Sequence, residues 1–433
     1  MMKVQKYPAY KDSGVEWLGE IPEHWEVTRI KNLFKEINER SSSGDEELLS
    51  ISQYSGVTRK SDKLEEGDLL TTASTLEGYK KVYKGDLVSN IMLAWNGSLG
   101  FSPFEGITSP AYCTYRLQGK NNKQFFHYLL RTEIYKAEFK RNSSGVIDSR
   151  LRLYSDDFFR IVALCPPLPE QTAIAQFLDR KTALIDQAID IKQKQIELLK
   201  ERRQILIHQA VTRGLDPDVK IKDSGVKWIG EVPEHWEVVK NRELFQERKE
   251  PGNENLPLLA VSIHTAVSSE ELSAEENIRG RIRIEDKSQY KLVEIGDVVF
   301  NMMRAWQGAI GAVSTKGMVS PAYVVARPKK TFDSNFFEYQ YRTETFIKQM
   351  DRSSKGITDF RKRLYWNEFK QLVTILPPPN EQQEISRFIS ALNAKTDKAF
   401  FCKQQEILKL QEYKATLINS AVTGKIKVGS HAQ

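Results

Sequence analysis

Two short turns in the chain carry side chains that suit hydrogen bonding to the edges of DNA bases. One contains AWNG and the other AWQG, and each follows an asparagine. Asparagine, glutamine and arginine pair bidentately with adenine or guanine, and glycine lets a backbone approach its ligand closely. The side chains concerned are Asn90, Trp95 and Asn96 in the first turn and Asn301, Arg304, Trp306 and Gln307 in the second. The alternative is that the tryptophans pack in a core and the amides cap turns.

Two loops, residues 141–152 and 352–363, combine arginines with small hydroxyl side chains and a glycine. This composition is typical of phosphate-binding loops, because hydroxyls and backbone N–H groups donate alongside the guanidinium. We therefore predict contact with DNA, and a loop that is merely basic and solvated is the alternative. The candidates are Arg141, Ser143, Ser144, Arg150 and Arg152 in the first loop and Arg352, Ser353, Ser354, Arg361 and Arg363 in the second.

Motifs for catalysis are missing from the sequence. No [ND]PP[YF] segment could hold a target base, no GxxxxGK[ST] loop could bind ATP, and two GxxG spacings are too short for a dinucleotide or S-adenosylmethionine fingerprint. His24 and His235 each lie in PEHWEV without a second ligand nearby, so we interpret them as packing residues and not as metal ligands. We expect no catalytic residue and no metal site in this chain.

Charge and cysteine usage restrict the partners and the compartment. A formal net charge of +7 favours a polyanionic partner, although an unspecialised basic protein would have the same charge. Cys113, Cys165 and Cys402 form no CxxC pair, so we expect neither a zinc ribbon nor a disulfide framework, and a cytoplasmic location. We find no signal peptide and no run of 18 apolar residues, so we expect no membrane partner.

The chain is an internal duplication with an offset of 211 residues. Residues 12–34 and 223–245 are identical at 15 of 23 positions, and the same offset aligns residues 85–112 with 296–323. A period this long is not that of a solenoid; it indicates a duplicated domain pair with a pseudo-two-fold axis. Residues 41–84 and 252–295 have equal length but little identity. Two copies that share a scaffold and differ in one insert suggest two sites of one kind with different targets.

The divergent inserts supply the candidates for base recognition. Their polar and basic side chains include Gln53, Tyr54, Arg59 and Lys60 in the first copy and His264, Arg279, Arg281 and Arg283 in the second. We expect these residues to contact bases, because the inserts are the stretch in which the two copies share little identity.

The first part of each repeat is predicted to be α+β. Glycine and proline separate short apolar runs, and residues 85–93 and 109–116 have the pattern of strands. Residues 125–139 have the 3.6-residue period of an amphipathic helix.

The second part of each repeat is predicted to be one long helix with apolar residues at heptad spacing. The first seam is Leu178, Ile185, Ile189, Ile196, Leu199, Leu206 and Ala210, with polar Thr182, Lys192 and Arg203. The second seam is Ile389, Thr396, Phe400, Ile407, Leu410, Leu417 and Ala421, with Asn393, Lys403 and Lys414. Because a small adjacent domain cannot bury so long a stripe, we predict that the helices pair with each other as an antiparallel coiled coil. The alternative is that each packs on an outside partner.

The expected architecture is therefore two duplicated globular domains separated by two long helices. We place the globular domains at residues 10–168 and 221–379 and the helical regions at residues 169–214 and 380–425.

From about residue 10 to residue 425 the chain resembles the DNA specificity subunits of type I restriction–modification systems. The resemblance rests on the doubled DSGxxWxGxxPxHW segment, the doubled RxSSxG-type loop, the LxPPxxEQ junction at residues 164–171 with a close variant at 376–382, and the two helices. It implies two target-recognition domains, each for one half of a bipartite, asymmetric site in double-stranded DNA, with the coiled coil setting the gap between the halves.

The resemblance also implies partners. Two methyltransferase (modification) subunits would dock on the helices, bring S-adenosylmethionine (SAM) and methylate an adenine in each half-site. Two motor–nuclease (restriction) subunits would bring ATP hydrolysis and cleavage, with Mg²⁺. The specificity chain itself would hold no cofactor.

Two other functions stay open at this point. A single-chain DNA-modifying enzyme with unusual motifs would bind SAM by itself. A structural coiled-coil scaffold, with domains that bind proteins, would show little salt dependence in any affinity for DNA.

Overall fold

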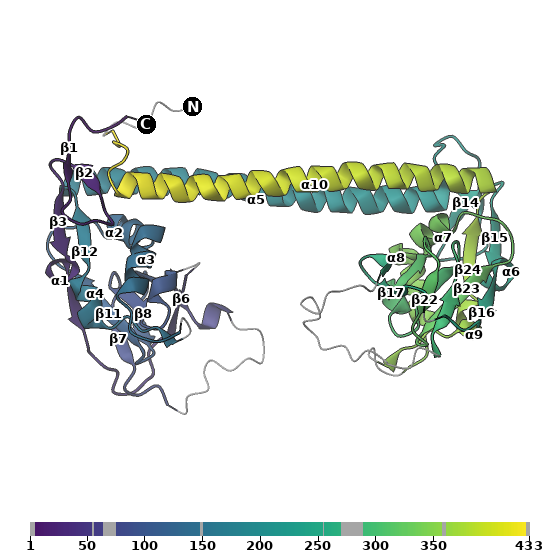
Figure 1. Ribbon diagram of the computed structural model, residues 1–433, viewed down its shortest axis with the longest axis horizontal. Coiled ribbons are helices and arrows are strands. Elements are labelled where there is room, and N and C mark those ends of the chain that lie inside the picture. Colours follow the sequence, from purple (N-terminus) through teal and green to yellow (C-terminus); the bar gives the residue numbers. More distant parts are fainter. Residues whose placement is uncertain are drawn as a thin grey trace. The chain divides into compact units, whose positions relative to one another are not determined.

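The computed structural model describes residues 5–53, 56–63, 75–147, 150–253, 255–269, 289–356 and 361–429, and the chain forms two compact units. The first unit is Met1–Lys192 with Gln405–Gln433, and the second is Gln193–Gln404. Each unit combines a globular α+β part with paired segments of two long helices (Figure 1). The predicted fold class is confirmed.

A four-stranded antiparallel sheet in the order β4-β11-β8-β9 lies at the centre of the first unit, with four two-stranded pairs around it, β1-β2, β3-β12, β5-β6 and β7-β10. Its strands are β1 (Tyr10–Asp12), β2 (Glu20–Pro22), β3 (Glu26–Arg29), β4 (Phe34–Ile37), β5 (Leu49–Ser52), β6 (Gly56–Arg59), β7 (Lys80–Val82), β8 (Leu87–Asn90), β9 (Leu99–Phe101), β10 (Gly106–Thr108), β11 (Tyr112–Leu117) and β12 (Val162–Cys165). Its short helices are α1 (Ile30–Leu33), η1 (Ser61–Lys63), η2 (Ala94–Asn96), α2 (Lys123–Leu130), α3 (Glu133–Arg141) and α4 (Ser155–Arg160).

The second unit repeats this plan, with sheets in the orders β16-β23-β20-β21 and β18-β17-β22-β19 and the pairs β13-β14 and β15-β24. Its strands are β13 (Ile221–Asp223), β14 (Glu231–Pro233), β15 (Glu237–Lys240), β16 (Phe245–Arg248), β17 (Leu258–Ser262), β18 (Ala266–Ser269), β19 (Lys291–Val293), β20 (Val298–Asn301), β21 (Ile310–Ala312), β22 (Gly317–Val319), β23 (Tyr323–Pro328) and β24 (Val373–Leu376). Its short helices are α6 (Asn241–Leu244), η5 (Ala305–Gln307), α7 (Ser334–Tyr341), α8 (Glu344–Ser353) and α9 (Trp366–Phe369).

The duplication extends to strand register. Thr114 lies opposite Val88 in the first unit, and their counterparts at an offset of 211, Val325 and Val299, are opposite each other in the second. The strands expected in residues 85–93 and 109–116 are β8 and β11, so both predictions are confirmed.

The helix expected over residues 125–139 is wrong as a single element, because the structure breaks it into α2 and α3. The Thr132 hydroxyl donates to the Leu129 carbonyl at 2.8 Å, and its backbone is extended with φ −68° and ψ 155°. Thr132 therefore ends one helix and precedes the next, since a local side-chain bond competes with helix continuation.

The core of each unit is aromatic and includes residues from both long helices, α5 (Leu168–Arg213) and α10 (Pro379–Val422). In the first unit Leu178 of α5 and Val422 of α10 are fully buried in the same cluster. In the second, Val211 of α5 and Ile389 of α10 have these roles. Each globular part is thus covered by the start of one long helix and the end of the other.

Within each unit the segments of α5 and α10 are antiparallel and side by side (Figure 1). In the first unit Asp186 bonds Lys414 at 2.6 Å and Lys192 bonds Glu406 at 2.7 Å. Residue numbers therefore increase along α5 while those of the facing residues on α10 decrease, as in an antiparallel pair. All predicted seam residues of both helices are buried or half-buried. The predicted coiled-coil seam is confirmed.

The polar seam residues have a structural explanation. In the second unit Arg203 bonds Asp397 at 2.9 Å and lies over the ring of Phe400. By the offset of 211 this ion pair is the counterpart of the one between Lys414 and Asp186. Polar seam positions of this kind specify register, because another register would leave the charges without partners.

Candidate nucleic-acid interface

The turn after β8 has the same construction in both units. The buried Asn90 accepts a hydrogen bond from the backbone N–H of Met92 at 3.0 Å, and Gly97 closes η2 with a φ of +88°. Asn301 accepts from Met303 in the same way at 2.9 Å. These two asparagines therefore hold the turn, and the capping alternative is correct for them.

The other amides of the turns remain at the surface. Asn96 is half-buried, and Arg304 and Gln307 are exposed, with 3.4 Å between a guanidinium nitrogen of Arg304 and the side-chain oxygen of Gln307. Arg304 and Gln307 are therefore accessible from solvent, and Asn96 is partly accessible.

The tryptophans of the turns are half-buried and support lysines. Trp95 donates from Nε1 to the Met92 carbonyl at 3.0 Å, and Lys140 lies 5.2 Å from its ring centroid. In the second unit Lys362 lies 5.1 Å from the ring centroid of Trp306. A cation over a tryptophan face is attracted to it and held in place, so each turn has a positioned lysine that the sequence did not reveal. Lys362 also forms an ion pair with Asp351 at 2.7 Å.

The structure brings each turn together with the basic loop of the same unit. Leu153 donates its backbone N–H to the Ile91 carbonyl at 2.8 Å, and Leu364 donates to Met302 at 2.8 Å. We call the combined region the turn–loop surface of each unit; it consists of residues 91–97 with 140–147 and 150–154 in the first unit, and of residues 302–308 with 351–356 and 361–365 in the second. The two motif groups predicted separately from the sequence thus form one surface in each copy.

The base of each basic loop is a backbone bridge. Ser144 and Arg152 exchange both backbone hydrogen bonds at 2.9 Å, and their counterparts Lys355 and Arg363 do so at 2.8 Å. Gly145 occupies a backbone conformation with φ +148°, and a Cβ there would lie 2.6 Å from the Arg150 carbonyl oxygen. The glycine is therefore required for the loop to close.

Several predicted loop residues already have partners within the chain. The Ser143 hydroxyl donates to the Phe139 carbonyl at 2.7 Å and the Ser354 hydroxyl donates to Met350 at 2.8 Å, so both protons cap a helix end. The Arg141 guanidinium binds Glu138 bidentately, at 2.7 and 2.8 Å, but is 70% exposed. The exposed members of the predicted set are Arg141, Ser144, Arg150, Arg352 and Arg361, while Ser143, Arg152, Ser353, Ser354 and Arg363 are half-buried.

A half-buried arginine joins the divergent insert to the strand that follows the turn in each unit. Arg342 donates to the backbone carbonyls of Ile263 and His264, at 2.9 and 3.0 Å, and to that of Ile310 at 3.3 Å. Its counterpart Arg131 donates to the carbonyls of Gln53 and Leu99. Burial lowers the pKa of both guanidinium groups. The recurring RTE tripeptide was the only sequence signal for this pair.

The divergent inserts begin as hairpins, β5-β6 and β17-β18. Gln53 and Lys60 are half-buried and Arg59 is exposed, with its guanidinium 4.7 Å from the ring centroid of Phe104. His264 is exposed at the tip of β17-β18. The other predicted residues, Tyr54, Arg279, Arg281 and Arg283, lie outside the described residues.

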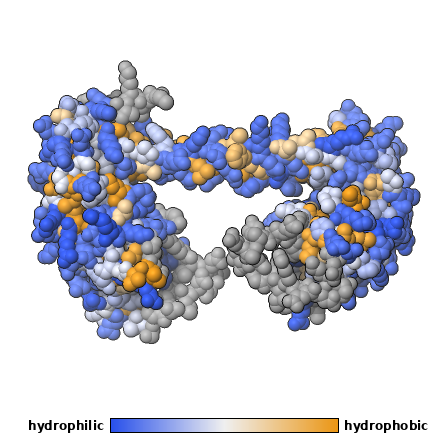
Figure 2. All heavy atoms as spheres, viewed as in Figure 1, coloured by the Kyte–Doolittle hydropathy of each residue, from blue (hydrophilic) through white to orange (hydrophobic). Residues whose placement is uncertain are grey.

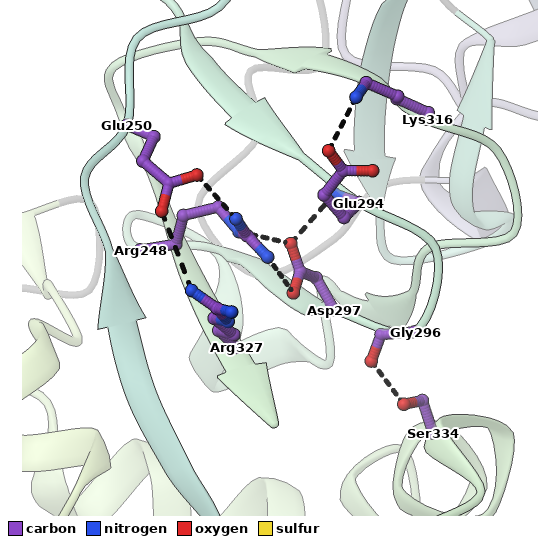
Figure 3. Close-up of polar contacts among 8 residues, drawn as sticks. All are labelled: Arg248, Glu250, Glu294, Gly296, Asp297, Lys316, Arg327 and Ser334. Carbon is purple, nitrogen blue, oxygen red and sulfur yellow. Dashed lines mark hydrogen bonds and ion pairs between the residues drawn. The ribbon is translucent and has the colours of Figure 1, made fainter. Parts of the chain in front are cut away.

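A buried ion pair holds the loop that precedes β20 and the second turn (Figure 3). Arg248 binds Asp297 at 2.8 and 3.3 Å, and Asp297 also accepts from the Glu294 backbone at 2.9 Å. In the first unit the same aspartate, Asp86, binds Arg116 at 2.9 and 3.0 Å. The arginine therefore comes from β16 in one copy and from β11 in the other, although the aspartate is constant.

The histidines of the PEHWEV segments connect each globular part to a long helix. His24 bonds Glu170 at 2.8 Å and His235 bonds Glu381 at 2.6 Å, with histidine side chains 49% and 46% exposed. Each histidine is therefore hydrogen-bonded to a long helix at the surface and also packs on a neighbouring aromatic ring, His24 on Tyr7 and His235 on Trp236. In the described ranges no cluster of three or more metal-ligating side chains occurs, and none of their helices is long and apolar enough to cross a membrane.

Comparison with known proteins agrees with this architecture. The type I restriction modification DNA specificity domain matches residues 22–201. The type I restriction enzyme MjaVIII specificity subunit of Methanocaldococcus jannaschii is 24% identical over 94% of this chain and 94% of its own length. The EcoBI specificity subunit of Escherichia coli is 27% identical over 74% of this chain and 69% of its own length.

Solved structures share the fold. A chain from a structural study of assembly and conformational transition in the type I R-M system superposes with a TM-score of 0.64 at 13% identity, covering 93% of this chain and 98% of that one. The HsdS subunit from Thermoanaerobacter tengcongensis gives 0.53 at 12% identity, with 94% and 98% covered. Residues 22–201 thus match the type I restriction modification DNA specificity domain, and along nearly its whole length the chain is similar to the specificity subunits of type I restriction enzymes.

Proposed function

We propose that this chain is the DNA-recognition subunit of a type I restriction–modification complex and has no catalytic site of its own. Each target-recognition domain, residues 10–168 and 221–379, contacts one half of a bipartite, asymmetric site in double-stranded DNA. The observation that carries the proposal is the pairing, in both units, of a constant turn–loop surface with a hairpin of divergent sequence. A constant surface suits the DNA backbone, which is the same at every site, and a divergent one suits bases.

Phosphate contacts are assigned to the turn–loop surfaces. Their exposed guanidinium groups and the lysines over Trp95 and Trp306 place positive charge beside a glycine-containing loop. The residues proposed for phosphate contact are Arg141, Ser144, Arg150 and Arg152, and Arg352, Arg361 and Arg363; Ser143, Ser353 and Ser354 lie in the same loops. Backbone contacts of this kind orient a protein on DNA without selecting sequence.

Base contacts are assigned to the hairpins and to the exposed amides of the turns. Arg59 in the first unit and Arg304 and Gln307 in the second are exposed and suited to guanine or adenine edges. Gln53, Tyr54, Lys60 and Asn96 complete the proposed set of the first unit, and Arg279, Arg281 and Arg283 that of the second.

The paired helices set the gap between half-sites and dock the partners. On α5 the apolar side chains Leu184 and Ile191 in the first unit and Leu198 and Ile205 in the second recur every seven residues and are between 48% and 64% exposed. Apolar patches interrupt the hydrophilic surface of the helices (Figure 2). A heptad stripe outside the seam suits a further helix, and we assign it to the two methyltransferase subunits.

The remaining chemistry belongs to partner subunits. Two methyltransferase subunits bring SAM and two motor–nuclease subunits bring ATP hydrolysis and Mg²⁺. A reducing cytoplasm suits the described cysteines, Cys113, Cys165 and Cys402, which are all free thiols.

The first experiment is a map of adenine methylation in cells that express this chain with its methyltransferase partner. Cells that lack only this chain are the control. We expect a bipartite, asymmetric methylated motif that disappears in the control. A map that is the same in both strains would contradict the proposal.

Salt dependence of DNA binding tests the phosphate assignment on the purified complex. Each phosphate contact releases counterions and contributes about 0.9 to the slope of log K against log salt. Arg361→Ala should therefore reduce the slope by about one and weaken binding equally for all sequences. Lys348→Ala is the control, because Lys348 is 64% exposed on α8 and pairs with Glu344 outside the turn–loop surface.

A further inference from the structure

The second unit contains a cavity of about 440 Å³ where the end of α5, the segment after it, β14 and the start of α10 meet. The cavity is lined by His235 and Glu381, which are hydrogen-bonded to each other, together with Leu215, Asp216 and Glu384. Its volume is within the range of about 300–1,000 Å³ that is usual for ligand pockets. No residue assigned to DNA contact belongs to its lining.

The duplication shows what fills the corresponding place in the first unit. Tyr7, only 6% exposed, lies 5.7 Å from the ring of His24 and 5.9 Å from that of Trp25, and its hydroxyl donates to Glu170. His24 and Glu170 are the counterparts of His235 and Glu381 at the offset of 211. The first unit therefore has a tyrosine side chain in the position that is a cavity in the second.

The sequence explains the difference. The counterpart of Tyr7 is Asp218, which is exposed and too short to reach Glu381. Because tyrosine is replaced by aspartate, Glu170 and Glu381 accept hydrogen bonds from different donors. In the second unit Glu381 accepts from Trp236 Nε1 at 2.9 Å, whereas in the first the Trp25 Nε1 is buried without a partner among the described residues. Tyr7 thus takes the hydrogen bond that Trp236 makes in the other copy.

The charges around the cavity restrict its occupant further. Asp216, Glu381 and Glu384 are acidic, and Arg213, which also lines the cavity, is 3.9 Å from Glu231. In the first unit the segment that supplies the tyrosine is basic, since residues 3–11 read KVQKYPAYK. An acidic rim around an aromatic-sized cavity suits a tyrosine flanked by lysines.

We propose that the cavity of the second unit is a docking site for a lysine-flanked tyrosine presented by another protein chain, in the manner of residues 5–8 in the first unit. The tyrosine ring enters between His235 and Leu215, and its hydroxyl donates to Glu381. The first unit fills the corresponding position with Tyr7 of its own chain, whereas the second unit binds a tyrosine from another chain.

The test uses the full chain and a fluorescein-labelled peptide of residues 3–11, with binding followed by anisotropy. We expect saturable binding, and binding on the order of tenfold weaker for the peptide in which Tyr7 is alanine, a loss typical of a buried aromatic anchor. Asp218→Tyr should fill the cavity and abolish binding, whereas Asp218→Ala, which leaves the cavity open, should retain it. Glu384→Lys should weaken binding of the basic peptide.

Three results would overturn the proposal: no saturable binding, equal binding of the alanine peptide, or binding unchanged by Asp218→Tyr in protein whose circular dichroism shows that it is folded. If Asp218→Tyr does not fold, Glu384→Lys decides the question. DNA binding is measured on the same samples and should be unchanged, so failure of this proposal is distinguishable from failure of the DNA-recognition function.

Discussion

The guanidinium of Arg342 donates to the backbone carbonyl of His264 at 3.0 Å, at the tip of the divergent hairpin of the second unit. Arg131 holds the Gln53 carbonyl in the first unit. A backbone carbonyl is the same whatever side chain follows it, so one constant arginine can hold hairpins of unrelated sequence. Arg131 and Arg342 are therefore positioning residues for whatever the hairpins contact.

Replacing either arginine should impair recognition of one half-site only. Arg342→Ala removes the donor from the carbonyls of Ile263, His264 and Ile310, a loss of about 0.5–1.5 kcal/mol per hydrogen bond that loosens the hairpin. We expect binding to weaken by about tenfold, with the loss of discrimination confined to bases of the half-site that the second domain contacts. Oligonucleotides substituted in one half-site at a time measure this. Equal loss of discrimination in both half-sites would contradict the positioning role. Arg342→Lys, which keeps one donor group, should retain part of the discrimination that Arg342→Ala loses.

The two arginine–aspartate pairs should differ in their contribution to stability. Arg248 is 7% exposed beside Asp297, whereas Arg116 is 42% exposed beside Asp86. Removing one partner of a buried pair leaves an uncompensated charge and costs about 3–5 kcal/mol. Arg248→Met should therefore lower the free energy of unfolding far more than Arg116→Met, as chemical denaturation of the two variants would show. Comparable losses would mean that Asp297 finds another partner.

Gly308→Ala should disturb the second turn more than backbone strain alone explains. Gly308 has φ +90°, and a Cβ there would lie 2.9 Å from Ile347 Cδ1. Gly225→Ala is the matched control, because Gly225 has φ +71° with no atom within 4 Å of a Cβ. Both variants bear the left-handed strain of about 1–2 kcal/mol. Only Gly308→Ala should also weaken DNA binding. A similar loss of DNA binding in Gly225→Ala would contradict the assignment of the second turn to the DNA interface.

Stability of the first unit should fall on mild acidification. Burial, with the nearby Arg131 charge, lowers the pKa of His127 from 6.5 to about 4. The unfolded chain then takes up a proton at a pH where the folded chain does not, so stability is lost as pH falls from about 6.5 towards 4, by about 3 kcal/mol. His127→Gln should flatten this part of the pH profile in denaturation experiments. His264→Gln, at an exposed position, should leave the profile unchanged.

Shortening the coiled coil by one heptad should shorten the gap between half-sites. Deletion of residues 193–199 with residues 401–407 removes seven residues from each helix and keeps the seam in register. At about 1.5 Å per residue this is about 10 Å, or about three base pairs. The methylated motif should keep both halves and lose these base pairs from its gap. An unchanged gap would contradict the spacing role, and deletion from α5 alone should disrupt the seam.

Much of the fold was predictable because its signals are periodic or duplicated. The heptad spacing correctly identified the seam residues of both helices, from Leu178 to Ala421, which are buried or half-buried. The offset of 211 correctly identified the equivalent turns and loops of the two units. The break at Thr132 was not predictable, since a single hydroxyl bond ends a helix whose apolar period continues. Arg131 and Arg342 escaped prediction because their partners are backbone carbonyls, which carry no sequence signal. The hydrogen bonds of His24 and His235 were not predicted, because their glutamate partners lie 146 residues away in the chain.

The division of the chain into units has a consequence for synthesis on the ribosome. The second unit, Gln193–Gln404, is continuous, whereas the first needs Ala421 and Val422 to complete its core. A domain folds as a unit once all of its residues have emerged. The first unit must therefore wait, incompletely packed, until Ala421 and Val422 have been synthesised, and the second unit is the first to reach its native state.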